Sequence, residues 1–464
     1  MKRKTEKVET MMAENIHNVY IVTLGCPKNL VDTEVMTGAL LTAGFDLTME
    51  PAAADLYLIN TCAFILPARE EAEAAIEVAI EWKKAQPKTR RIVIAGCLIQ
   101  WDKKQIYREK YPEIDLWSGV DWVEAVGLQA VKLFGGKSTA DYLLDAEPTY
   151  LYDENTPRLQ LTVPHIAYLK IAEGCSHRCA YCSIPSIRGN LRSRTVESVV
   201  KEAENLRRNG VKELVLIAQD TSAYGNDLQT TDDNLPELLR RLNQLDDGDY
   251  WVRMLYTHPA SFSDELIEVI AGYEHILPYV DIPLQHIADP ILTSMRRQCD
   301  GVQIRELLTK LRQRIPGIGL RTTFITGYPG ETAENFQELY DFIKEVKFER
   351  LGVFAYFDEP DTPACEFADK VPVEVGEQRR DSLMELQQEI SLNINKSLIG
   401  TELEVIIDMV EDDEFAVGRS VIDAPEIDNE VVVKYQGELE AGDIIRVRVT
   451  EVDAYTLIAQ SCEV

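Results

Sequence analysis

Three cysteines stand close together near the middle of the chain, in the stretch Lys170–Pro185 (KIAEGCSHRCAYCSIP). Cys175, Cys179 and Cys182 have the spacing C-x3-C-x2-C and follow directly on a short apolar run that we expect to be a strand. Thiolates at this spacing on one loop can reach three corners of an iron–sulfur cube. The fourth iron then has no protein ligand and can bind a small molecule.

Zinc is the alternative metal for this loop. A structural zinc takes four protein ligands, and the fourth usually comes from a second paired motif. His177 could supply it, but His177 lies inside the loop between two of the cysteines. The spacing therefore favours an iron–sulfur cluster with one open iron.

A second set of three cysteines is spread over the first hundred residues. Cys26, Cys62 and Cys97 each follow a predicted strand by one or two residues, in the contexts TLGCPKN, LINTCAF and VIAGCLIQ. The carboxyl ends of parallel strands share one edge of a sheet, so these three side chains can meet in space. The alternative is three unrelated buried cysteines, because cysteine is often buried. The shared placement predicts a second metal site with three thiolate ligands.

The segment that carries this second set, residues 17–136, alternates apolar β-rich runs with helical patterns. Such alternation predicts a small, doubly wound parallel sheet. The expected strands are Asn18–Leu24, Leu56–Asn60 and Arg91–Ala95, with helices at Glu34–Thr42 and Arg69–Lys84.

The middle segment, residues 160–396, contains six strand–helix units. Six units rather than eight predict a partial (β/α)6 barrel. A helix over Glu377–Ile394 closes the segment. The expected strands are Ile166–Ile171, Glu213–Ala218, Trp251–Tyr256, Tyr279–Leu284, Leu320–Thr326 and Gly352–Phe357.

The last segment, residues 398–464, holds five short β-rich runs. Five strands in so few residues predict a small OB-like β-barrel. The expected strands are Glu402–Met409, Glu414–Ser420, Glu430–Tyr435, Ile444–Thr450 and Tyr455–Gln460.

Composition and charge narrow the classes of function. The chain of 464 residues has 48 Lys and Arg against 78 Asp and Glu, a net charge of −30, which argues against a free-standing nucleic-acid binder. No apolar run follows the charged N-terminus, and the longest uncharged stretch, Leu56–Ala68, is too short to span a bilayer. We expect a cytoplasmic protein without membrane partners, whose nine cysteines do not form structural disulfides.

The middle segment resembles the radical S-adenosylmethionine (SAM) superfamily. The resemblance lies in the C-x3-C-x2-C loop, with the aromatic Tyr181 before Cys182. In that superfamily the open iron binds the amino and carboxylate groups of SAM. An electron from the reduced cluster then splits a carbon–sulfur bond of SAM and produces a 5′-deoxyadenosyl radical. The resemblance implies that Tyr181 lies against the adenine.

Over nearly its whole length the chain resembles the methylthiotransferase family. The order is the same: a three-cysteine domain, a radical SAM core and a C-terminal TRAM barrel. The resemblance implies two 4Fe-4S clusters, one at each set of cysteines, with SAM on the second.

Local motifs resemble the group of that family that modifies a ribosomal protein. The stretch FDEPDTPA near Phe357 departs from it, because a Glu-Gly pair is expected before Thr-Pro, so no role is transferred to that loop. The matching motifs are LGCPKNLVDTE (Leu24–Glu34), SIPSIRG (Ser183–Gly189), YTHP (Tyr256–Pro259), YVDIPLQH (Tyr279–His286) and RTTFITGYPGET (Arg321–Thr332).

This resemblance implies methylthiolation of the β-carbon of an aspartate in small-subunit ribosomal protein twelve. One SAM would be the radical source and another the methyl donor. The C–H bond attacked has no acidity that a base can exploit, but a primary carbon radical can abstract its hydrogen. The cluster at the N-terminal cysteines would hold the sulfur. A low-potential electron donor and a sulfur source are implied as partners.

Other residues are weaker candidates. Gln219 and Asp220 follow the second barrel strand, at the edge where active sites form, so we expect a contact of Gln219 with SAM; a capping pair is the alternative. A basic run past the cysteine loop could meet a carboxylate of SAM or of the target aspartate, or be a solvated loop. This run contains Arg188, Arg192 and Arg194.

For the remaining candidates we expect structural roles. His258 and His286 are predicted to make hydrogen bonds, and Gly327 and Gly330 to form turns beside the cofactor. Burial or no role is expected for Cys299, Cys365 and Cys462.

The charge of the last segment bears on the substrate. Residues 397–464 contain 17 acidic and 4 basic residues, a net charge of −13. Such a surface repels a phosphate backbone, so direct RNA binding is not expected, and it attracts a basic ribosomal protein. Two alternatives stay open: a tRNA adenosine methylthiotransferase, and a non-catalytic iron–sulfur or RNA-binding scaffold.

Overall fold

The computed structural model describes residues 16–135, 141–230, 232–246 and 248–462. The chain divides into two compact units. We call them the N-terminal unit (residues up to 161, with 173–176 and 183–192) and the C-terminal unit (162–172, 177–182 and 193 onward). Each is described by itself.

The N-terminal unit is built on a six-stranded, wholly parallel sheet with the order β2-β1-β3-β4-β5-β6. Every residue of the central strand β3 is buried, as expected for a strand covered on both faces. The doubly wound parallel sheet is therefore confirmed. The strands are β1 (His17–Thr23), β2 (Phe45–Leu47), β3 (Leu56–Thr61), β4 (Arg91–Gly96), β5 (Leu116–Ser118) and β6 (Asp141–Leu143).

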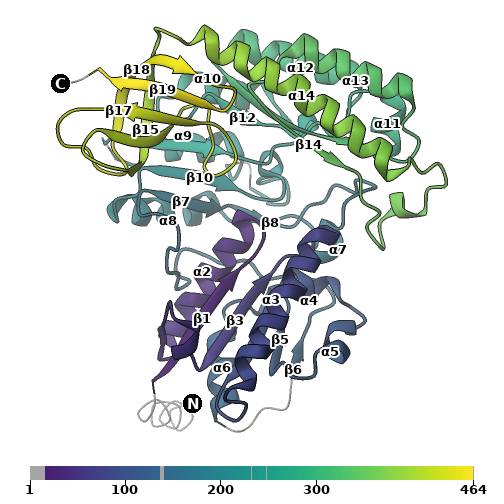
Figure 1. The fold of residues 1–464 in the computed structure, drawn as a ribbon, viewed down its shortest axis with the longest axis vertical. Coiled ribbons are helices and arrows are strands. Elements are labelled where there is room, and N and C mark those ends of the chain that lie inside the picture. Colours follow the sequence, from purple (N-terminus) through teal and green to yellow (C-terminus); the bar gives the residue numbers. More distant parts are fainter. Residues whose placement is uncertain (1–15, 136–140, 231, 247, 463–464) are drawn as a thin grey trace. The chain divides into compact units, whose positions relative to one another are not determined.

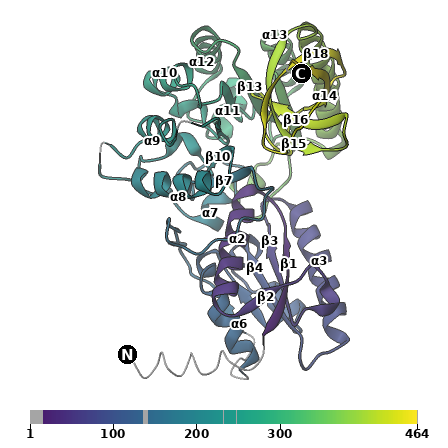
Figure 2. The same cartoon turned by 90° about the vertical axis from the view of Figure 1, so that its left-hand side faces the viewer.

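Helices cover both faces of this sheet. Figures 1 and 2 show α2 and α3 on opposite faces, with α6 beside α2. The helices are α2 (Pro27–Thr42), α3 (Leu66–Lys84), α4 (Cys97–Trp101), α5 (Ile106–Lys110), α6 (Val126–Phe134) and α7 (Ile184–Arg188), with 3-10 turns η1 (Pro51–Ala53) and η2 (Val120–Trp122).

Helix α2 begins seven residues earlier than the sequence predicts. Proline stands at its first position, where the missing N–H costs nothing. Its first turns bury the polar side chains of Asn29, Asp32 and Thr33, so the apolar periodicity that reveals a helix is absent there.

The C-terminal unit contains the six predicted β/α strands, all parallel to their neighbours. They form two three-stranded sheets, β11-β10-β7 and β12-β13-β14. This arrangement confirms the partial (β/α)6 barrel. The strands are β7 (Ile166–Lys170), β10 (Glu213–Ile217), β11 (Trp251–Met254), β12 (Tyr279–Asp281), β13 (Gly319–Thr326) and β14 (Arg350–Ala355). The short strands β8 (Ala172–Glu173) and β9 (Arg192–Ser193) flank the cysteine loop in the sequence.

Consecutive helices pack along the outside of these strands, as Figure 2 shows for α8, α9, α10 and α12. Most begin at a side-chain cap, for example Thr195, Ser263 and Asp300. The helices are α8 (Val196–Arg208), α9 (Leu235–Leu242), α10 (Asp264–Gly272), α11 (Asp289–Ser294), α12 (Gly301–Arg314), α13 (Ala333–Val346) and α14 (Val373–Ser397), with 3-10 turns η3 (Thr221–Ala223), η4 (Pro259–Ser261) and η5 (Pro363–Glu366).

The last five strands close into a barrel with the order β15-β16-β17-β19-β18, which confirms the OB-like barrel (yellow in Figure 1). Its interior is filled by apolar residues that alternate along each strand. The strands are β15 (Glu402–Val410), β16 (Phe415–Ser420), β17 (Glu430–Lys434), β18 (Ile444–Val452) and β19 (Thr456–Ser461).

The loop 421–429 between β16 and β17 packs against the N-terminal ends of the β/α strands. A side chain on Gly319, the first residue of β13, would lie 2.6 Å from Ile422. Three arginines of the core strands bind this loop: the buried Arg253 donates to the Val421 carbonyl, the half-buried Arg321 pairs with Asp428 and the buried Arg350 with Asp423. The small barrel thus closes one end of the partial barrel.

The predicted domain limits of 17–136, 160–396 and 398–464 stay predictions, since the division into compact units groups the small barrel with the core. In the described part of the chain, no helix has the length and apolar character needed to cross a bilayer.

Candidate functional site

The N-terminal cysteines follow three neighbouring strands of the parallel sheet. Cys62 and Cys97 come directly after β3 and β4, and Cys26 comes three residues after β1, slightly later than predicted. Burial is the main cause that raises the pKa of Cys62 and Cys97, and the Cys26 thiol adds to it at both. Because β1, β3 and β4 are neighbours and a Cβ atom on Gly25, next to Cys26, would lie 3.0 Å from the Cys62 sulfur, the three cysteines gather at one edge of the sheet.

Two glycines that were not predicted as site residues permit this convergence. Gly25 and Gly96 have φ angles of +91° and +98°, which side chains disfavour. A Cβ atom on Gly25 would lie 2.6 Å from the Cβ of Cys62, and one on Gly96 would lie 2.3 Å from Oδ1 of Asn60. The signal was available, because glycine directly precedes Cys26 and Cys97 in the sequence.

The donor set suits an iron–sulfur cluster. Sulfur ligands select iron–sulfur clusters, zinc or copper over harder metals. Burial raises the pKa of Cys97 to about 12, so without metal the thiol keeps its proton, which metal binding releases. Among the described residues, no three His, Cys, Asp or Glu side chains are arranged to hold a single metal ion. A cluster attaches each thiolate to a different iron, so three thiolates from three neighbouring strand ends suit it.

Arg188 lies among these cysteines, in the same unit. Its Nη2 donates to the Cys97 sulfur (3.1 Å), and its Nη1 pairs with Asp32 (2.7 Å) and Glu173 (3.3 Å). Its side chain is 4% exposed. Neither expectation for the basic run holds at this residue, because Arg188 is not solvated and internal carboxylates occupy its guanidinium.

The other two arginines of that run are also held by the protein. Arg194 is buried and pairs with Glu202. Arg192 donates to the carbonyls of Arg188, Asn190 and Tyr150.

The second set of cysteines lies on one loop whose residues belong to both units. Cys175 is in the N-terminal unit, where its N–H donates to the Gly189 carbonyl (3.0 Å). Cys179 and Cys182 are in the C-terminal unit, where Ala180 between them binds the backbones of Met295 and Ala364. Backbone hydrogen bonds therefore hold the loop on each side.

A second arginine touches a cysteine sulfur in the C-terminal unit. Arg297 Nη1 lies 3.6 Å from the Cys179 sulfur and 3.4 Å from the Tyr181 hydroxyl, and Nη2 donates to the Pro283 carbonyl (2.8 Å). Tyr181 also packs against a buried apolar cluster that includes Tyr328. The adenine contact of Tyr181 stays a prediction.

His177, the candidate zinc ligand, has other partners. Its Nε2 lies 2.7 Å from Asp220, and its ring stacks on His258 at a centroid distance of 4.1 Å. Asp220 also accepts from the Ser222 hydroxyl and the Ala223 N–H, so it is partly the predicted capping residue. Gln219 is half-buried two residues past β10, and its contact with SAM stays a prediction.

The two barrel histidines make the predicted hydrogen bonds. Nδ1 of His258 accepts from the Ala260 N–H, and Nδ1 of His286 accepts from the Ala288 N–H. Burial lowers the pKa of His258 to about 2 and that of His286 to about 3, with smaller contributions from Arg297 and Arg379 respectively. Both rings are therefore neutral at neutral pH.

Gly327 and Gly330 form the predicted turn after β13, where Glu331 accepts from the Gly327 N–H (2.6 Å). Cys299 and Cys365 are partly exposed and Cys462 is exposed, and none of them forms a disulfide.

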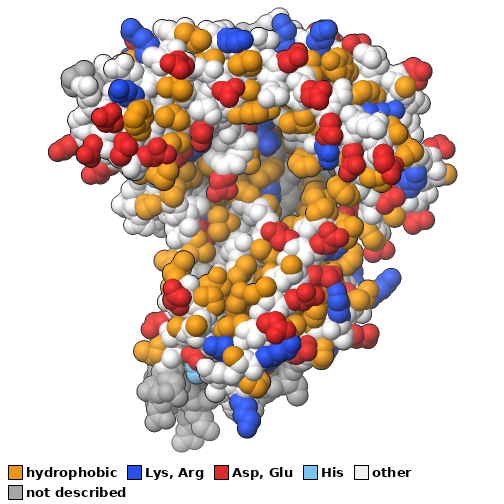
Figure 3. All heavy atoms as spheres, viewed as in Figure 1, with side chains coloured by type: hydrophobic (Ala, Val, Ile, Leu, Met, Phe, Trp, Pro, Cys, Tyr) orange, Lys and Arg blue, Asp and Glu red, His pale blue; other side chains and the backbone are white. Residues whose placement is uncertain are grey.

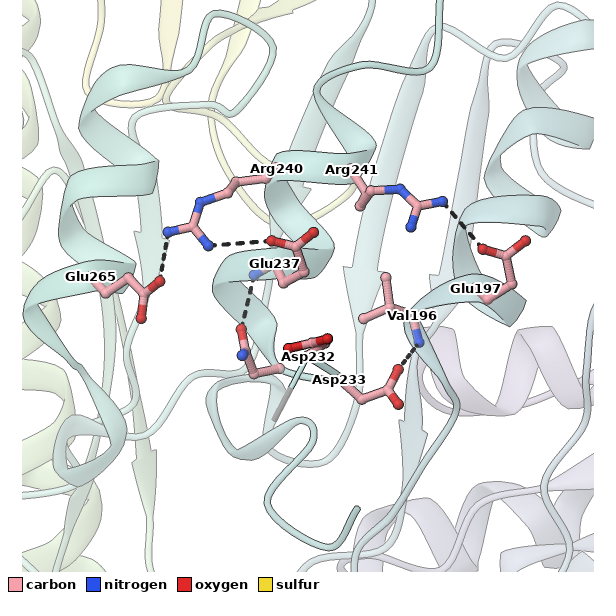
Figure 4. Close-up of a pocket in the computed structure, with 9 residues that line it drawn as sticks. Val196, Glu197, Asp232, Asp233, Glu237, Arg240, Arg241 and Glu265 are labelled. Carbon is pink, nitrogen blue, oxygen red and sulfur yellow. Dashed lines mark hydrogen bonds and ion pairs between the residues drawn. The ribbon is translucent and has the colours of Figure 1, made fainter. Parts of the chain in front are cut away.

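A surface cavity of about 730 Å³ lies away from the cysteines, among residues of α8, α9 and α10. Figure 4 shows that its charged side chains pair with one another: Arg240 binds Glu265 and Glu237, and Arg241 binds Glu197. None of the predicted site residues lines this cavity.

Family models match all three segments. The radical SAM superfamily model matches residues 169–343, the model of uncharacterized protein family UPF0004 matches residues 18–119, and the TRAM domain model matches residues 399–461. The fold and these matches define a radical SAM enzyme with an added N-terminal domain and a TRAM barrel.

Curated relatives match this chain over nearly its full length. The chain is 43% identical over 445 residues to the ribosomal protein uS12 methylthiotransferase RimO of Desulforamulus reducens, covering 96% of this chain and 99% of that one. It is 44% identical over 447 residues to the protein of the same name from Syntrophus aciditrophicus, covering 96% and 98%. The chain belongs to the RimO family of methylthiotransferases, whose cofactors are SAM and two 4Fe-4S clusters.

Solved structures share the fold at low identity. The radical SAM methyltransferase TsrM from Kitasatospora setae, solved with cobalamin and a 4Fe-4S cluster, matches with a TM-score of 0.55 and 17% identity, over 75% of this chain and 77% of that one. The cobalamin-dependent radical SAM enzyme OxsB matches with a TM-score of 0.51 and 13% identity, over 83% and 57%.

Proposed function

We propose that the protein adds a methylthio group to the β-carbon of an aspartate in ribosomal protein uS12, with one SAM as radical source and another as methyl donor. The observation that carries this proposal is the full-length identity to relatives named for that reaction. Two sets of three cysteines, each with a structural setting that suits a cluster, support it.

In this proposal Cys175, Cys179 and Cys182 hold the cluster that binds SAM. When bound, that cluster supplies the electron that splits SAM. The chain's own residues orient the loop: Asp220 holds His177, and Arg297 holds Tyr181 and donates to Cys179. Tyr181 and Gln219 are the proposed contacts of SAM.

The cluster at Cys26, Cys62 and Cys97 has a different role, the attachment of sulfur. The converging strand ends and the glycines before two of these cysteines hold the ligands in place. Two sites with two roles explain why one chain has both sets of cysteines.

The charge of the small barrel supports a basic protein as substrate. Asp408, Asp423 and Asp428 face inward and pair with buried or half-buried arginines. The thirteen other described acidic residues of the barrel are exposed, against three exposed basic ones, so this charge is available to a partner. Figure 3 shows a row of acidic side chains over the barrel at the upper left. RNA would be repelled by this surface.

The other partners follow from the chemistry. Reduction of the SAM-binding cluster requires a low-potential electron donor, and each turnover consumes a sulfur atom from an external source. We propose the cytoplasm as the site of the reaction, as a ribosomal-protein substrate implies.

Mass spectrometry of uS12 and of tRNA from a strain lacking this protein tests the proposal. We expect uS12 to lose the methylthio mass while tRNA keeps its own. Loss from tRNA alone would instead identify a tRNA adenosine methylthiotransferase. If reduced protein produced no 5′-deoxyadenosine from SAM, the non-catalytic scaffold would be the correct function.

A further inference from the structure

We infer that Arg188 is a positioning residue of the N-terminal cluster, which orients Cys97 and raises the reduction potential of the iron bound there. The inference rests on the cluster proposed at Cys26, Cys62 and Cys97. It adds a role for a residue that is not itself a ligand.

The contacts of Arg188 use both ends of its planar guanidinium. Nη2 donates to the Cys97 sulfur at 3.1 Å and to Asn29 Oδ1 at 3.3 Å. Nη1 pairs with Asp32 at 2.7 Å and with Glu173 at 3.3 Å. Asn29 and Asp32 lie on α2, directly after Cys26, so one side chain connects the surroundings of two cysteines of the site.

Burial makes this connection rigid and specific. The side chains of Arg188, Asp32 and Glu173 are 4%, 3% and 4% exposed, so their charges are not screened by water. A buried charge requires a partner, and the fork geometry of arginine satisfies several acceptors at once. Lysine offers a point charge and cannot reproduce the same set of bonds.

The direction of the effect follows from charge. Reduction adds an electron to a site already surrounded by thiolates and by two carboxylates. A cation hydrogen-bonded to a ligand sulfur stabilises the reduced form and raises the potential, since hydrogen bonds to the sulfurs and net charge are among the factors that set it. Without Arg188, the negative charges of Asp32 and Glu173 near this site would oppose reduction more strongly.

Arg188 and its partner Glu173 stand on either side of the SAM-cluster loop in the sequence. Glu173 stands two residues before Cys175, and Arg188 stands six residues after Cys182. Their ion pair therefore joins the two ends of the SAM-cluster loop, and the same guanidinium contacts Cys97.

The experiment isolates one cluster at a time in the full-length chain. In a background with Cys175, Cys179 and Cys182 changed to Ala, the anaerobically reconstituted protein retains only the N-terminal cluster. Its midpoint potential is measured by redox titration followed by electron paramagnetic resonance, and its iron loss to a chelator is timed.

In this background we expect Arg188→Met to shift the potential to a more negative value and to accelerate iron loss about tenfold or more, the usual cost of removing a residue that supports a metal ligand. Arg188→Lys should recover part of the potential, because it keeps the charge, but not the iron retention. An unchanged potential in Arg188→Met with full iron would overturn the inference.

Two further variants separate this role from a general folding role. Arg188→Met combined with Asp32→Asn removes one charge of each sign and leaves no new unpaired carboxylate at Asp32; its potential should still fall if the hydrogen bond to Cys97 matters. Arg90→Met is the matched control. Arg90 is buried and bound to backbone carbonyls at the opposite end of β4, and its loss should leave the potential unchanged.

The reciprocal background, with Cys26, Cys62 and Cys97 changed to Ala, tests specificity. In this background Arg188→Met should shift the midpoint potential of the remaining cluster less than it shifts that of the N-terminal cluster. Arg297→Met should show the opposite preference and shift the potential of the remaining cluster more. An equal effect of Arg188→Met in both backgrounds would contradict the assignment to the N-terminal cluster. If the parent of the first background binds no cluster, the proposed function fails; if it binds one that ignores Arg188, only this inference fails.

Discussion

The backbone at Gly96 leaves no room for a side chain beside the N-terminal cysteines. A methyl group there would lie 2.3 Å from Asn60 Oδ1 and 2.6 Å from the Thr61 carbonyl, at a φ of +98°. Neither neighbour is the free end of a long side chain, so the strand end itself would have to move. Gly96 ends β4, and its backbone conformation sets the position of Cys97, the next residue.

Gly96→Ala should therefore lower the free energy of unfolding and reduce iron at the N-terminal site. The strained φ alone costs on the order of 1–3 kcal/mol, and the contact adds to it. Gly44→Ala is a matched control, because Gly44 has a similar φ of +89° but nothing within 4 Å of the added methyl group. Denaturant unfolding and iron analysis of both variants measure the difference. Equal losses would show that the close contact is unimportant.

His286 links the stability of the core to pH. Burial lowers its pKa to about 3 from 6.5, so the folded protein keeps this ring neutral while the unfolded chain takes up a proton below pH 6.5. Stability is fully present above pH 6.5 and falls as the pH drops toward 3, at about 1.4 kcal/mol per pH unit for this one group.

We expect His286→Asn to reduce that slope while the Asn oxygen still accepts the Ala288 N–H. Urea unfolding at pH 7, 6 and 5 measures the slope. The same slope in the variant and the parent would show that His286 does not titrate on unfolding.

Side-chain contacts such as those of Arg188 could not be predicted from the sequence. Cysteine spacing and strand ends predicted both sets of candidate ligands. The partners of Arg188, in contrast, stand 15 to 159 residues away in the chain, and no periodic pattern connects them. Conflicting expectations for the basic run could only be resolved once these side chains were placed.

At the scale of elements, apolar runs located the central strands well and the short ones poorly. β3, β4, β7, β10 and β11 are buried runs with clear ends. β2, β5 and β6 have only three residues each, too few to establish a period. The start of α2 was missed because its polar residues are buried around the cysteine site.

The ion pairs that join core strands to the small barrel are a second feature of this scale. Glu213, the first residue of β10, binds Arg253 of β11 and Arg419 of β16, and all three are buried. Removing the carboxylate would leave Arg253 with the neutral Val421 carbonyl and Arg419 with Asp408 as its one remaining carboxylate among the described contacts.

Glu213→Gln should accordingly destabilise the C-terminal unit by about 3–5 kcal/mol. Glu197→Gln, which disrupts exposed pairs with Lys201 and Arg241, should cost about 0–1 kcal/mol and serves as the control. Denaturant unfolding followed by fluorescence measures both. A loss at Glu213 no larger than at Glu197 would mean that the buried network does not stabilise the unit.

At the scale of the whole molecule, charge is distributed unevenly along the chain. The small barrel has a net charge of −13 within a total of −30. The exposed loop between β15 and β16 has four consecutive acidic residues, Glu411–Glu414. Asp412 accepts hydrogen bonds from that loop's own backbone, so its neighbours are the better sites for substitution.

Reversal of Glu411, Asp413 and Glu414 to Lys should weaken association with uS12 and reduce its dependence on salt. Reversal of Glu338, Asp341 and Glu345, exposed on α13, changes the total charge equally and should have a smaller effect. Surface plasmon resonance at several salt concentrations measures both. Equal effects would assign the attraction to overall charge rather than to the barrel.

The closure of one end of the partial barrel by the loop 421–429 has a consequence for protein engineering. A chimera that exchanges this C-terminal module for that of another methylthiotransferase must also carry acceptors for Arg253, Arg321 and Arg350. A truncated enzyme would expose those cations and the apolar contact at Gly319 together. Loss of activity after such a deletion would therefore have two possible causes, damage to the catalytic core and loss of the recognition surface.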